Sequence, residues 1–195
     1  TEDTVPLAKM NLALHGLSGD IRQANSYYED PHRAVGAFDY VMANPPFNVD
    51  KIKKDQLAGD RRFPFGLPKA DNGNYLWIQQ FYAALAPTGR AGFVMASSAS
   101  DSANRDRDIR EKLVNTGHVD VMMAIGNKFF YTRSLPCTLW FFDKGKPQDL
   151  QDQVLMIDAR NVYHVVSARS HVFTDEQLAN LNAIVWLYRG ETEKF

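Results

Sequence analysis

Segments with helical and strand periodicity alternate along most of the chain, and this order limits the folds open to it. We expect helices over residues 7–17, 74–86, 102–116 and 174–189, and strands over residues 38–43, 90–97, 118–125, 135–142 and 154–158. Strands that alternate with helices form a parallel α/β sheet. The connection between the third and fourth strands is too short for a crossover helix, so this pair should be antiparallel and close a mostly parallel sheet.

Several local features complete the expected organisation. Residues 18–36 are polar, with one short strand expected around Ile21, and residues 49–72 form a long loop rich in charged residues, glycine and proline. Loops of that length in compact domains are usually functional or mobile. The last helix begins with a capping-box pattern, in which Thr174 is followed by Gln177. The single cysteine, Cys137, lies in an apolar run, which indicates a buried thiol and is compatible with a reducing cytoplasm.

The composition is that of an ordinary soluble domain, with 45% hydrophobic residues, 23% charged residues and a net charge of −1. Bulk charge therefore does not indicate nucleic-acid binding, and any grip on DNA must come from local clusters or from a partner subunit. The sequence contains no membrane-length apolar run and no cluster of cysteine and histidine. Neither a membrane nor a metal ion is therefore expected.

The strongest chemical signal is Asn44-Pro45-Pro46-Phe47, which follows the strand expected at residues 38–43, a strand predicted to be buried. Prolines lack a backbone N–H and stiffen the turn, and a residue before proline is held extended. The motif thus presents the Asn44 side-chain oxygen and the Pro45 carbonyl beside the aromatic face of Phe47. Such acceptors suit a planar ring with an exocyclic amino group. An ordinary turn is the alternative, but the position at a strand end favours a ligand site.

Together with its neighbours, the motif makes this chain resemble the methyltransferase subunit of type I restriction–modification systems. That family consists of DNA adenine-N6 methyltransferases that use S-adenosylmethionine. The resemblance covers nearly the whole chain and is carried by residues 7–16 (LAKMNLALHG), 38–47 (FDYVMANPPF), 72–77 (NGNYLW), 89–94 (GRAGFV), 109–113 (IREKL), 127–130 (NKFF) and 139–142 (LWFF). The MNLALHG segment is more particular to this subunit than NPPF, which other amino-methylating enzymes share.

The resemblance implies roles for the motif. Asn44 and the Pro45 carbonyl would accept the two amino hydrogens of adenine and direct the nitrogen lone pair at the sulfonium methyl group. Pro46 would belong to the same catalytic motif, and Phe47 would stack on the flipped-out base. Phe130 or Phe129 would supply the opposite face, although paired aromatic residues between strands are often core residues.

The resemblance also implies a fold and a division of the chain. The fold would be the Rossmann-like fold of S-adenosylmethionine-dependent methyltransferases, with its N-terminal part missing. A partial catalytic domain would cover residues 1–145, and a strand-and-helix extension would cover residues 146–195.

Parts of the family's cofactor site do not match this sequence. The glycine-rich loop after the family's first strand is absent, and the acidic residue that binds the cofactor ribose would precede Thr1. Where many relatives have an acidic residue near the cofactor adenine, this chain has Asn25. We assign Asn44 and Asn25 to S-adenosylmethionine. We also expect the chain alone to bind this cofactor weakly or not at all, and to be inactive.

Basic residues of the long loop are candidate DNA contacts: Lys51, Lys53, Lys54, Arg61 and Arg62. Aspartates interleave with them, so a solvated loop is the alternative. Because no base-reading helix or zinc module is evident, the resemblance implies action with the specificity and restriction subunits of one system in the cytoplasm. Two other functions remain open, namely a stand-alone methyltransferase acting on DNA or on protein glutamine, and a non-catalytic scaffold.

Overall fold

The structure is a computed structural model that describes residues 4–68, 72–130 and 134–194. Contacts along the chain divide it into two units, Thr1–Ala34 and Val35–Phe195. The boundary expected at residue 145 remains a prediction.

The first unit contains helix α1 (Thr4–Leu14) followed by turns. Gly16 has a φ of 68° just after the helix, as expected for a helix stop. Thr4 lies inside the helix and is not its cap. The expectation of a short strand around Ile21 was wrong, because this segment forms no strand. Here Arg22 donates a hydrogen bond of 2.6 Å to the Pro31 carbonyl.

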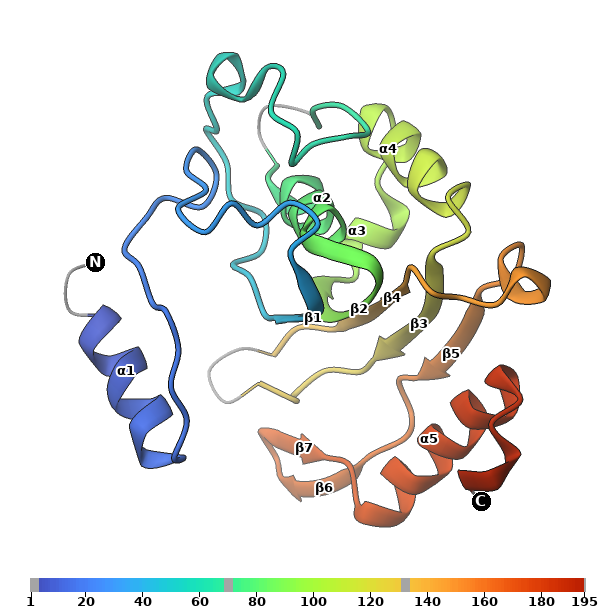
Figure 1. Cartoon of the computed structure of the whole chain (residues 1–195). Coiled ribbons are helices and arrows are strands. Elements are labelled where there is room, and N and C mark those ends of the chain that lie inside the picture. Colours follow the sequence, from blue (N-terminus) through green and yellow to red (C-terminus); the bar gives the residue numbers. More distant parts are fainter. Residues whose placement is uncertain (1–3, 69–71, 131–133, 195) are drawn as a thin grey trace. The chain divides into compact units, whose positions relative to one another are not determined.

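The second unit is built on a five-stranded sheet with the order β1-β2-β4-β3-β5. Its strands are β1 (Phe38–Ala43), β2 (Leu85–Ala96), β3 (Val119–Ile125), β4 (Cys137–Asp143) and β5 (Leu155–Ala159). β1 pairs in parallel with β2, and β3 pairs in parallel with β5. β4 is antiparallel to both of its neighbours. The expected mostly parallel sheet is confirmed, but its antiparallel strand lies inside the sheet and not at an edge (Figure 1).

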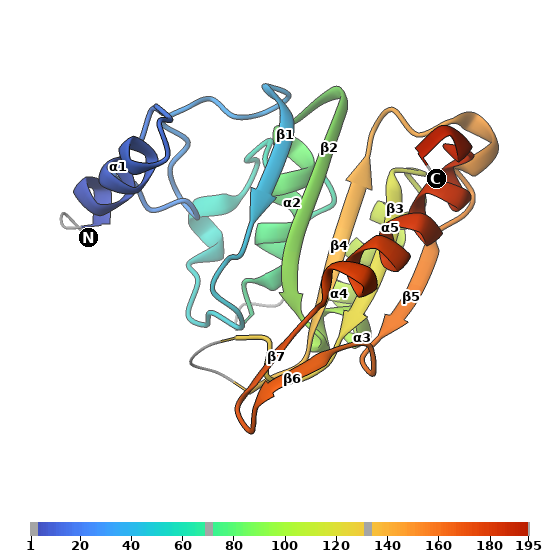
Figure 2. The ribbon, with the colours of Figure 1, turned by 90° about the horizontal axis from the view of Figure 1, so that it is seen from below.

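Helices cover both faces of the sheet (Figure 2). One face packs against α2 (Asn74–Ala84), α3 (Ser98–Asp101) and α4 (Arg105–Val114), with Tyr75, Phe93 and Trp140 among the buried core residues. The other face packs near its β3–β5 side against Leu181 of α5 (Asp175–Arg189). The capping box of Thr174 and Gln177 is present as expected.

Short elements occur in the connections of the second unit. They are the 3₁₀ turns η1 (Lys54–Leu57), η2 (Gln148–Leu150) and η3 (Thr192–Lys194), and the hairpin strands β6 (His164–Ser167) and β7 (Ser170–Val172). The hairpin was not expected from the sequence. One helix was expected over residues 102–116, but the observed α4 covers only Arg105–Val114. It is separate from α3, and Asn104 between the two helices has a φ of 56°.

The join between α2 and β2 lies earlier than expected. The helix ends at Ala84 and the strand begins at Leu85, so Pro87 and Gly89 lie in the strand. They occupy an irregular stretch of the β1–β2 pairing, where a proline without an N–H is tolerated. A Cβ atom on Gly89 would lie 2.8 Å from the Phe38 carbonyl oxygen, so this close approach requires glycine.

β1 is an edge strand among the described residues, and the expectation that it is buried was wrong. Val41 and Ala43 pack against the core, but Tyr40 is 77% exposed and Met42 is 90% exposed. The apolar run of this strand therefore faces two different environments, which its composition alone does not distinguish.

Cys137 is 3% exposed at the start of β4, as expected for a buried thiol. Burial raises the pKa of this thiol to about 11, because the thiolate would lose its hydration. The thiol therefore remains protonated at neutral pH.

Replacing Arg189 by alanine is expected to lower the free energy of unfolding by about 3 kcal/mol. Arg189 at the end of α5 donates to Asp120 of β3 through Nε at 3.0 Å, and Asp120 is only 1% exposed. Without the guanidinium, a buried carboxylate loses its ion-pair partner. Arg160→Ala is the matched control, because the side chains of its pair with Asp158 are both more than half exposed. Urea denaturation that shows equal losses for the two variants would contradict this account.

Candidate functional site

The motif Asn44–Phe47 leaves the sheet at the carboxyl ends of the parallel strands. β1 ends at Ala43, and β2 ends at Ala96, which lies opposite Cys137 at the start of β4. Ile125 at the end of β3 also lies opposite Cys137. Three segments therefore meet at the carboxyl ends of the parallel strands: the one that follows β1, the one that follows β2, and the loop between β3 and β4. Ligands of α/β sheets bind at these ends.

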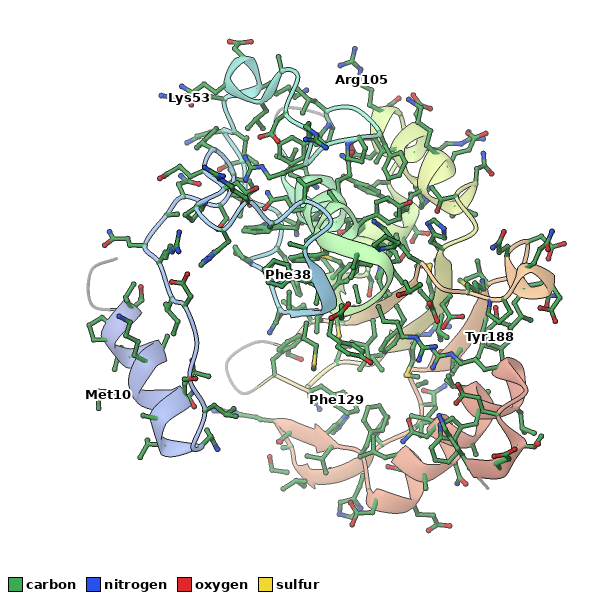
Figure 3. All side chains as sticks on the ribbon, in the orientation of Figure 1. Met10, Phe38, Lys53, Arg105, Phe129 and Tyr188 are labelled. Atoms are coloured by element: carbon green, nitrogen blue, oxygen red, sulfur yellow. The ribbon has the colours of Figure 1, made fainter. Side chains whose placement is uncertain are left out.

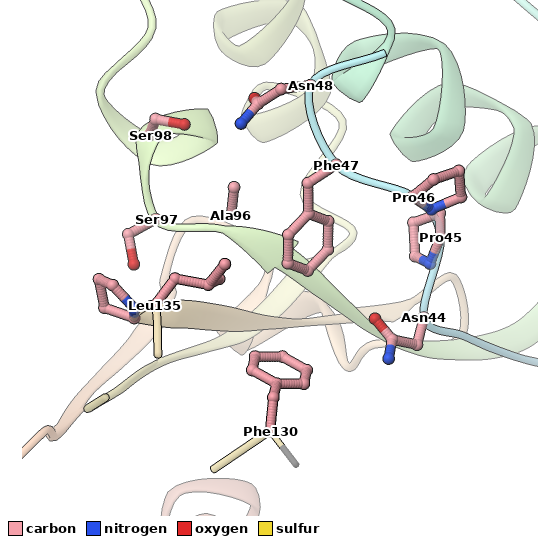
Figure 4. A pocket seen from close by; sticks show the side chains of 11 residues that line it. Asn44, Pro45, Pro46, Phe47, Asn48, Ala96, Ser97, Ser98, Phe130 and Leu135 are labelled. Carbon is pink, nitrogen blue, oxygen red and sulfur yellow. The ribbon is translucent and has the colours of Figure 1, made fainter. Parts of the chain in front are cut away.

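These segments line a cavity of about 700 Å³, which is within the usual size range of ligand sites (Figure 4). The lining comes from three places along the chain: Asn44, Pro45, Pro46, Phe47 and Asn48 after β1; Ala96, Ser97 and Ser98 at the end of β2; and Phe130, Leu135 and Pro136 before β4. All four residues of the expected motif thus line one cavity, together with one of the two aromatic residues expected opposite them.

Asn44 is exposed at the cavity, and Pro45 behind it is buried. Figure 4 shows the Asn44 amide beside the Phe47 and Phe130 rings. The side-chain amide of asparagine offers one acceptor oxygen and two donor hydrogens. Because neither proline of the motif has an N–H, the backbone at these positions can only accept hydrogen bonds.

Phe47 and Phe130 form a T-shaped pair, with ring centroids 6.3 Å apart and an angle of 78° between the ring planes. A planar ligand can stack on the face of one ring and contact the edge of the other. The pair is therefore an L-shaped aromatic corner and not a parallel clamp.

Phe129 does not line this cavity and packs against the hairpin side of the second unit (Figure 3). Its ring lies 4.7 Å from the Phe173 ring and 6.2 Å from the His171 ring, measured between centroids. These contacts favour a core position for Phe129, and the stacking role expected of Phe130 or Phe129 remains a prediction.

Six lining residues were not expected from the sequence to belong to the site: Asn48, Ala96, Ser97, Ser98, Leu135 and Pro136. Ser97 and Ser98 bring hydroxyl groups to the wall that faces the motif (Figure 4). A signal was available for them, because Ser97 ends an expected strand and Ser98 follows it, while the motif follows the end of another expected strand.

The basic loop residues differ in their surroundings. Lys51, Lys53 and Arg61 are exposed, and Lys54 is partly exposed. Arg62 is only 6% exposed, and its Nε donates to both carboxylate oxygens of Asp60 at 3.1 and 3.0 Å. These hydrogen bonds hold the pKa of Asp60 below its usual value. Arg62 therefore stabilises the loop through Asp60, and its expected contact with DNA remains a prediction.

Asn25 lies in the first unit, in a shallow hollow with Gln23, Ala24 and Glu29. Its side-chain oxygen accepts the Tyr27 N–H at 3.1 Å, and its own N–H donates to Glu29 Oε1 at 2.9 Å. These bonds give Asn25 a local role in a turn, and its expected contact with a cofactor remains a prediction.

The described residues contain neither a group suited to a metal ion nor a helix suited to crossing a membrane. No group of three or more His, Cys, Asp or Glu side chains there is placed to hold a metal ion. None of the helices in the described ranges combines the length and apolar character needed to cross a membrane.

Comparison with protein families gives a match over the whole chain. The family model described as N-6 DNA Methylase matches residues 1–195. The methylase subunit of the type I restriction enzyme MjaIX from Methanocaldococcus jannaschii is 38% identical over 192 residues, which cover 92% of this chain and 34% of that protein. The HindI methylase subunit from Haemophilus influenzae is 30% identical over 180 residues, which cover 91% of this chain and 40% of that protein. The chain thus spans a third to two fifths of the length of these relatives.

Solved structures show the same fold. A type I restriction–modification methyltransferase subunit from Streptococcus thermophilus superposes with a TM-score of 0.86 at 24% identity, covering 95% of this chain and 40% of the other. The M protein of the type I restriction enzyme EcoKI gives a TM-score of 0.69 at 22% identity, covering 94% of this chain and 38% of the other. The expected methyltransferase fold is thus confirmed.

Proposed function

We propose that this chain, which belongs to the N-6 DNA methylase family, carries the base-methylating site of an adenine-specific DNA methyltransferase of the type I restriction–modification class. The observation that carries the proposal is the cavity at the end of β1, where Asn44, Pro45 and the Phe47–Phe130 corner converge. Positioned acceptors beside an aromatic face match a base with an exocyclic amino group.

In this proposal the motif acts by orienting the target nitrogen. Asn44 Oδ1 and the Pro45 carbonyl each accept one hydrogen of the adenine N6 amino group. The two hydrogen bonds weaken the conjugation of the nitrogen lone pair with the ring and turn it out of the ring plane. The nitrogen then forms the new bond to the methyl carbon as the bond from that carbon to sulfur breaks, and the surplus proton on nitrogen leaves to solvent. Positioning of this kind supplies much of the rate acceleration in such reactions.

The aromatic corner holds the base in place. Phe47 stacks on the face of the flipped-out adenine, and Phe130 contacts its edge in the present arrangement. Stacking on an aromatic side chain contributes about 1–3 kcal/mol per base, which offsets part of the cost of removing the base from the duplex.

The lining of the cavity is compatible with S-adenosylmethionine, which when bound supplies a methyl group on a positively charged sulfur. None of the eleven described lining residues is cationic, so none of these side chains places a like charge beside the sulfonium. The Asn44 side chain and the two aromatic rings offer an acceptor and π faces, which both favour a nearby cation. Asn44 is thus the residue of this cavity assigned to both the base and the cofactor.

The chain alone is expected to bind S-adenosylmethionine weakly or not at all. This cavity supplies only the end of the cofactor site around Asn44. The glycine-rich turn that follows a strand in the family is not among the segments that carry the resemblance. Calorimetric titration of the 195-residue chain is expected to give no heat at micromolar cofactor. A dissociation constant in the micromolar range would contradict this prediction.

DNA and partner subunits complete the proposed function. Lys51, Lys53, Lys54 and Arg61 of the long loop are proposed to contact DNA phosphates, where each phosphate contact adds affinity and salt dependence. Recognition of the DNA sequence is assigned to a specificity subunit, and cleavage to a restriction subunit.

The partner dependence distinguishes this proposal from a stand-alone enzyme. Transfer of labelled methyl groups to adenine-unmethylated DNA is measured with the full-length product of the gene that encodes this chain, with and without its co-expressed specificity subunit. We expect transfer only in the presence of that subunit. Transfer by the full-length protein alone would favour a stand-alone enzyme, and no transfer from the folded complex would contradict DNA methylation.

A further inference from the structure

The backbone directly after the motif is held by the first turn of α2. The Asn48 N–H donates to Asn74 Oδ1 at 2.8 Å, and Asn74 Nδ2 donates back to Asn48 Oδ1 at 2.9 Å. The Gly73 N–H donates to the Val49 carbonyl at 2.8 Å. Three hydrogen bonds thus join residues 48–49 to residues 73–74, across a loop of more than twenty residues.

Asn48 is the point where the chain turns away from Phe47. Its φ is 54°, in the left-handed region that asparagine tolerates better than most residues. This conformation reverses the chain one residue after the aromatic side chain that lines the cavity. The direction of the Phe47 ring therefore depends on whether Asn48 keeps its turn.

Asn74 is placed to maintain that turn. It is 1% exposed, and its N–H donates to Asn72 Oδ1 at 2.9 Å. Asn72 provides the acceptor for the Asn74 N–H, and the Asn74 side chain reaches Asn48. Loss of the Asn74 side chain would leave the Asn48 N–H without its acceptor.

A second buried amide on the same helix provides a comparison. Gln79 is 0% exposed, its Oε1 accepts the Phe65 N–H at 2.9 Å, and its Nε2 donates to the Gly66 carbonyl at 2.9 Å. Gln79 therefore holds the later part of the same loop by the same kind of contacts. Neither Asn74 nor Gln79 lines the cavity.

We infer that Asn74 is a positioning residue, which through Asn48 sets the direction of the Phe47 ring against the target base. This inference rests on the proposed function. Gln79 has the same chemistry and the same burial but no link to the motif, so it has only a structural role. A comparison of variants at the two positions therefore distinguishes an effect on the site from an effect on stability.

The test compares Asn74→Ala with Gln79→Ala in the full-length protein with its specificity subunit. Both variants are expected to lower the melting temperature, because each removes a buried amide that makes hydrogen bonds to partly buried backbone groups of the loop. Only Asn74→Ala is expected to lower kcat, by about 10- to 100-fold, because a displaced base loses its alignment with the methyl donor. We expect the KM for S-adenosylmethionine to be unchanged in both variants.

Two further readouts sharpen the comparison. 2-Aminopurine at the target position is expected to fluoresce less with Asn74→Ala than with Gln79→Ala, because a smaller fraction of the base is held out of the duplex, where stacking on neighbouring bases quenches it. Asn74→Asp keeps an acceptor for the Asn48 N–H, so it should retain more of kcat than Asn74→Ala.

Equal kcat values for Asn74→Ala and Gln79→Ala would overturn the inference. So would equal losses in Asn74→Asp and Asn74→Ala. A wild-type complex that is folded and transfers no methyl group would remove the proposed function itself, and this result is visible before any variant is compared.

Discussion

Replacing Asn44 by alanine is expected to lower kcat for methyl transfer by about 10²- to 10³-fold, the usual cost of removing one positioned hydrogen-bonding group from an active site. Asn44 is exposed at the cavity next to Phe47, and in the proposed mechanism its Oδ1 accepts an amino hydrogen of the base. Alanine removes this acceptor and leaves the strand and the prolines in place. The measurement is single-turnover transfer of labelled methyl groups to DNA by the full-length complex.

Two variants control for other causes of this loss. Asn44→Asp keeps an oxygen acceptor at the same position and is expected to retain more activity than Asn44→Ala. Asn182→Ala changes an exposed asparagine on α5 and should leave kcat within about twofold, as is typical of surface substitutions. If Asn44→Ala transferred methyl groups as fast as Asn182→Ala, the role assigned to Asn44 would be wrong.

The second large effect is expected from Phe47→Ala. The stacking of one base on an aromatic side chain contributes about 1–3 kcal/mol, so binding of the flipped base should weaken by roughly 10- to 100-fold. The loss should be visible as a raised KM for DNA and a weaker 2-aminopurine signal at the target base. Phe47→Tyr keeps an aromatic face and should stay close to the wild-type values.

Phe38→Ala is the matched control for this prediction. Phe38 lies at the start of β1, whereas Phe47 follows its end, and its side chain is already 42% exposed. Removing it should leave the KM for DNA unchanged. A KM for DNA that rises equally in Phe38→Ala and Phe47→Ala would show that the effect comes from the strand and not from stacking.

Much of the fold followed from local patterns in the sequence. The antiparallel pairing of β3 and β4 followed from the short connection between them, and the start of α5 followed from the capping box at Thr174. The cavity residues of the motif followed from their position at a strand end. In each case one local rule decided the outcome.

The errors occurred where the outcome depends on contacts between distant segments. The apolar residues of β1 gave no sign that Met42 is exposed at an edge, because edge position depends on which strands pair. Phe129 and Phe130 are adjacent and chemically identical, and only the packing of Phe129 against Phe173 separates their roles. The bonds between Asn48 and Asn74 also join segments far apart in the chain, so no periodicity could reveal them.

The most direct test of the central claim is identification of the methylated product. DNA treated with the full-length complex and S-adenosylmethionine is digested to nucleosides, which are then analysed by mass spectrometry. The account predicts N6-methyladenine from the wild-type complex and its loss with Asn44→Ala. N4-methylcytosine, or N6-methyladenine that persists undiminished in Asn44→Ala, would contradict it.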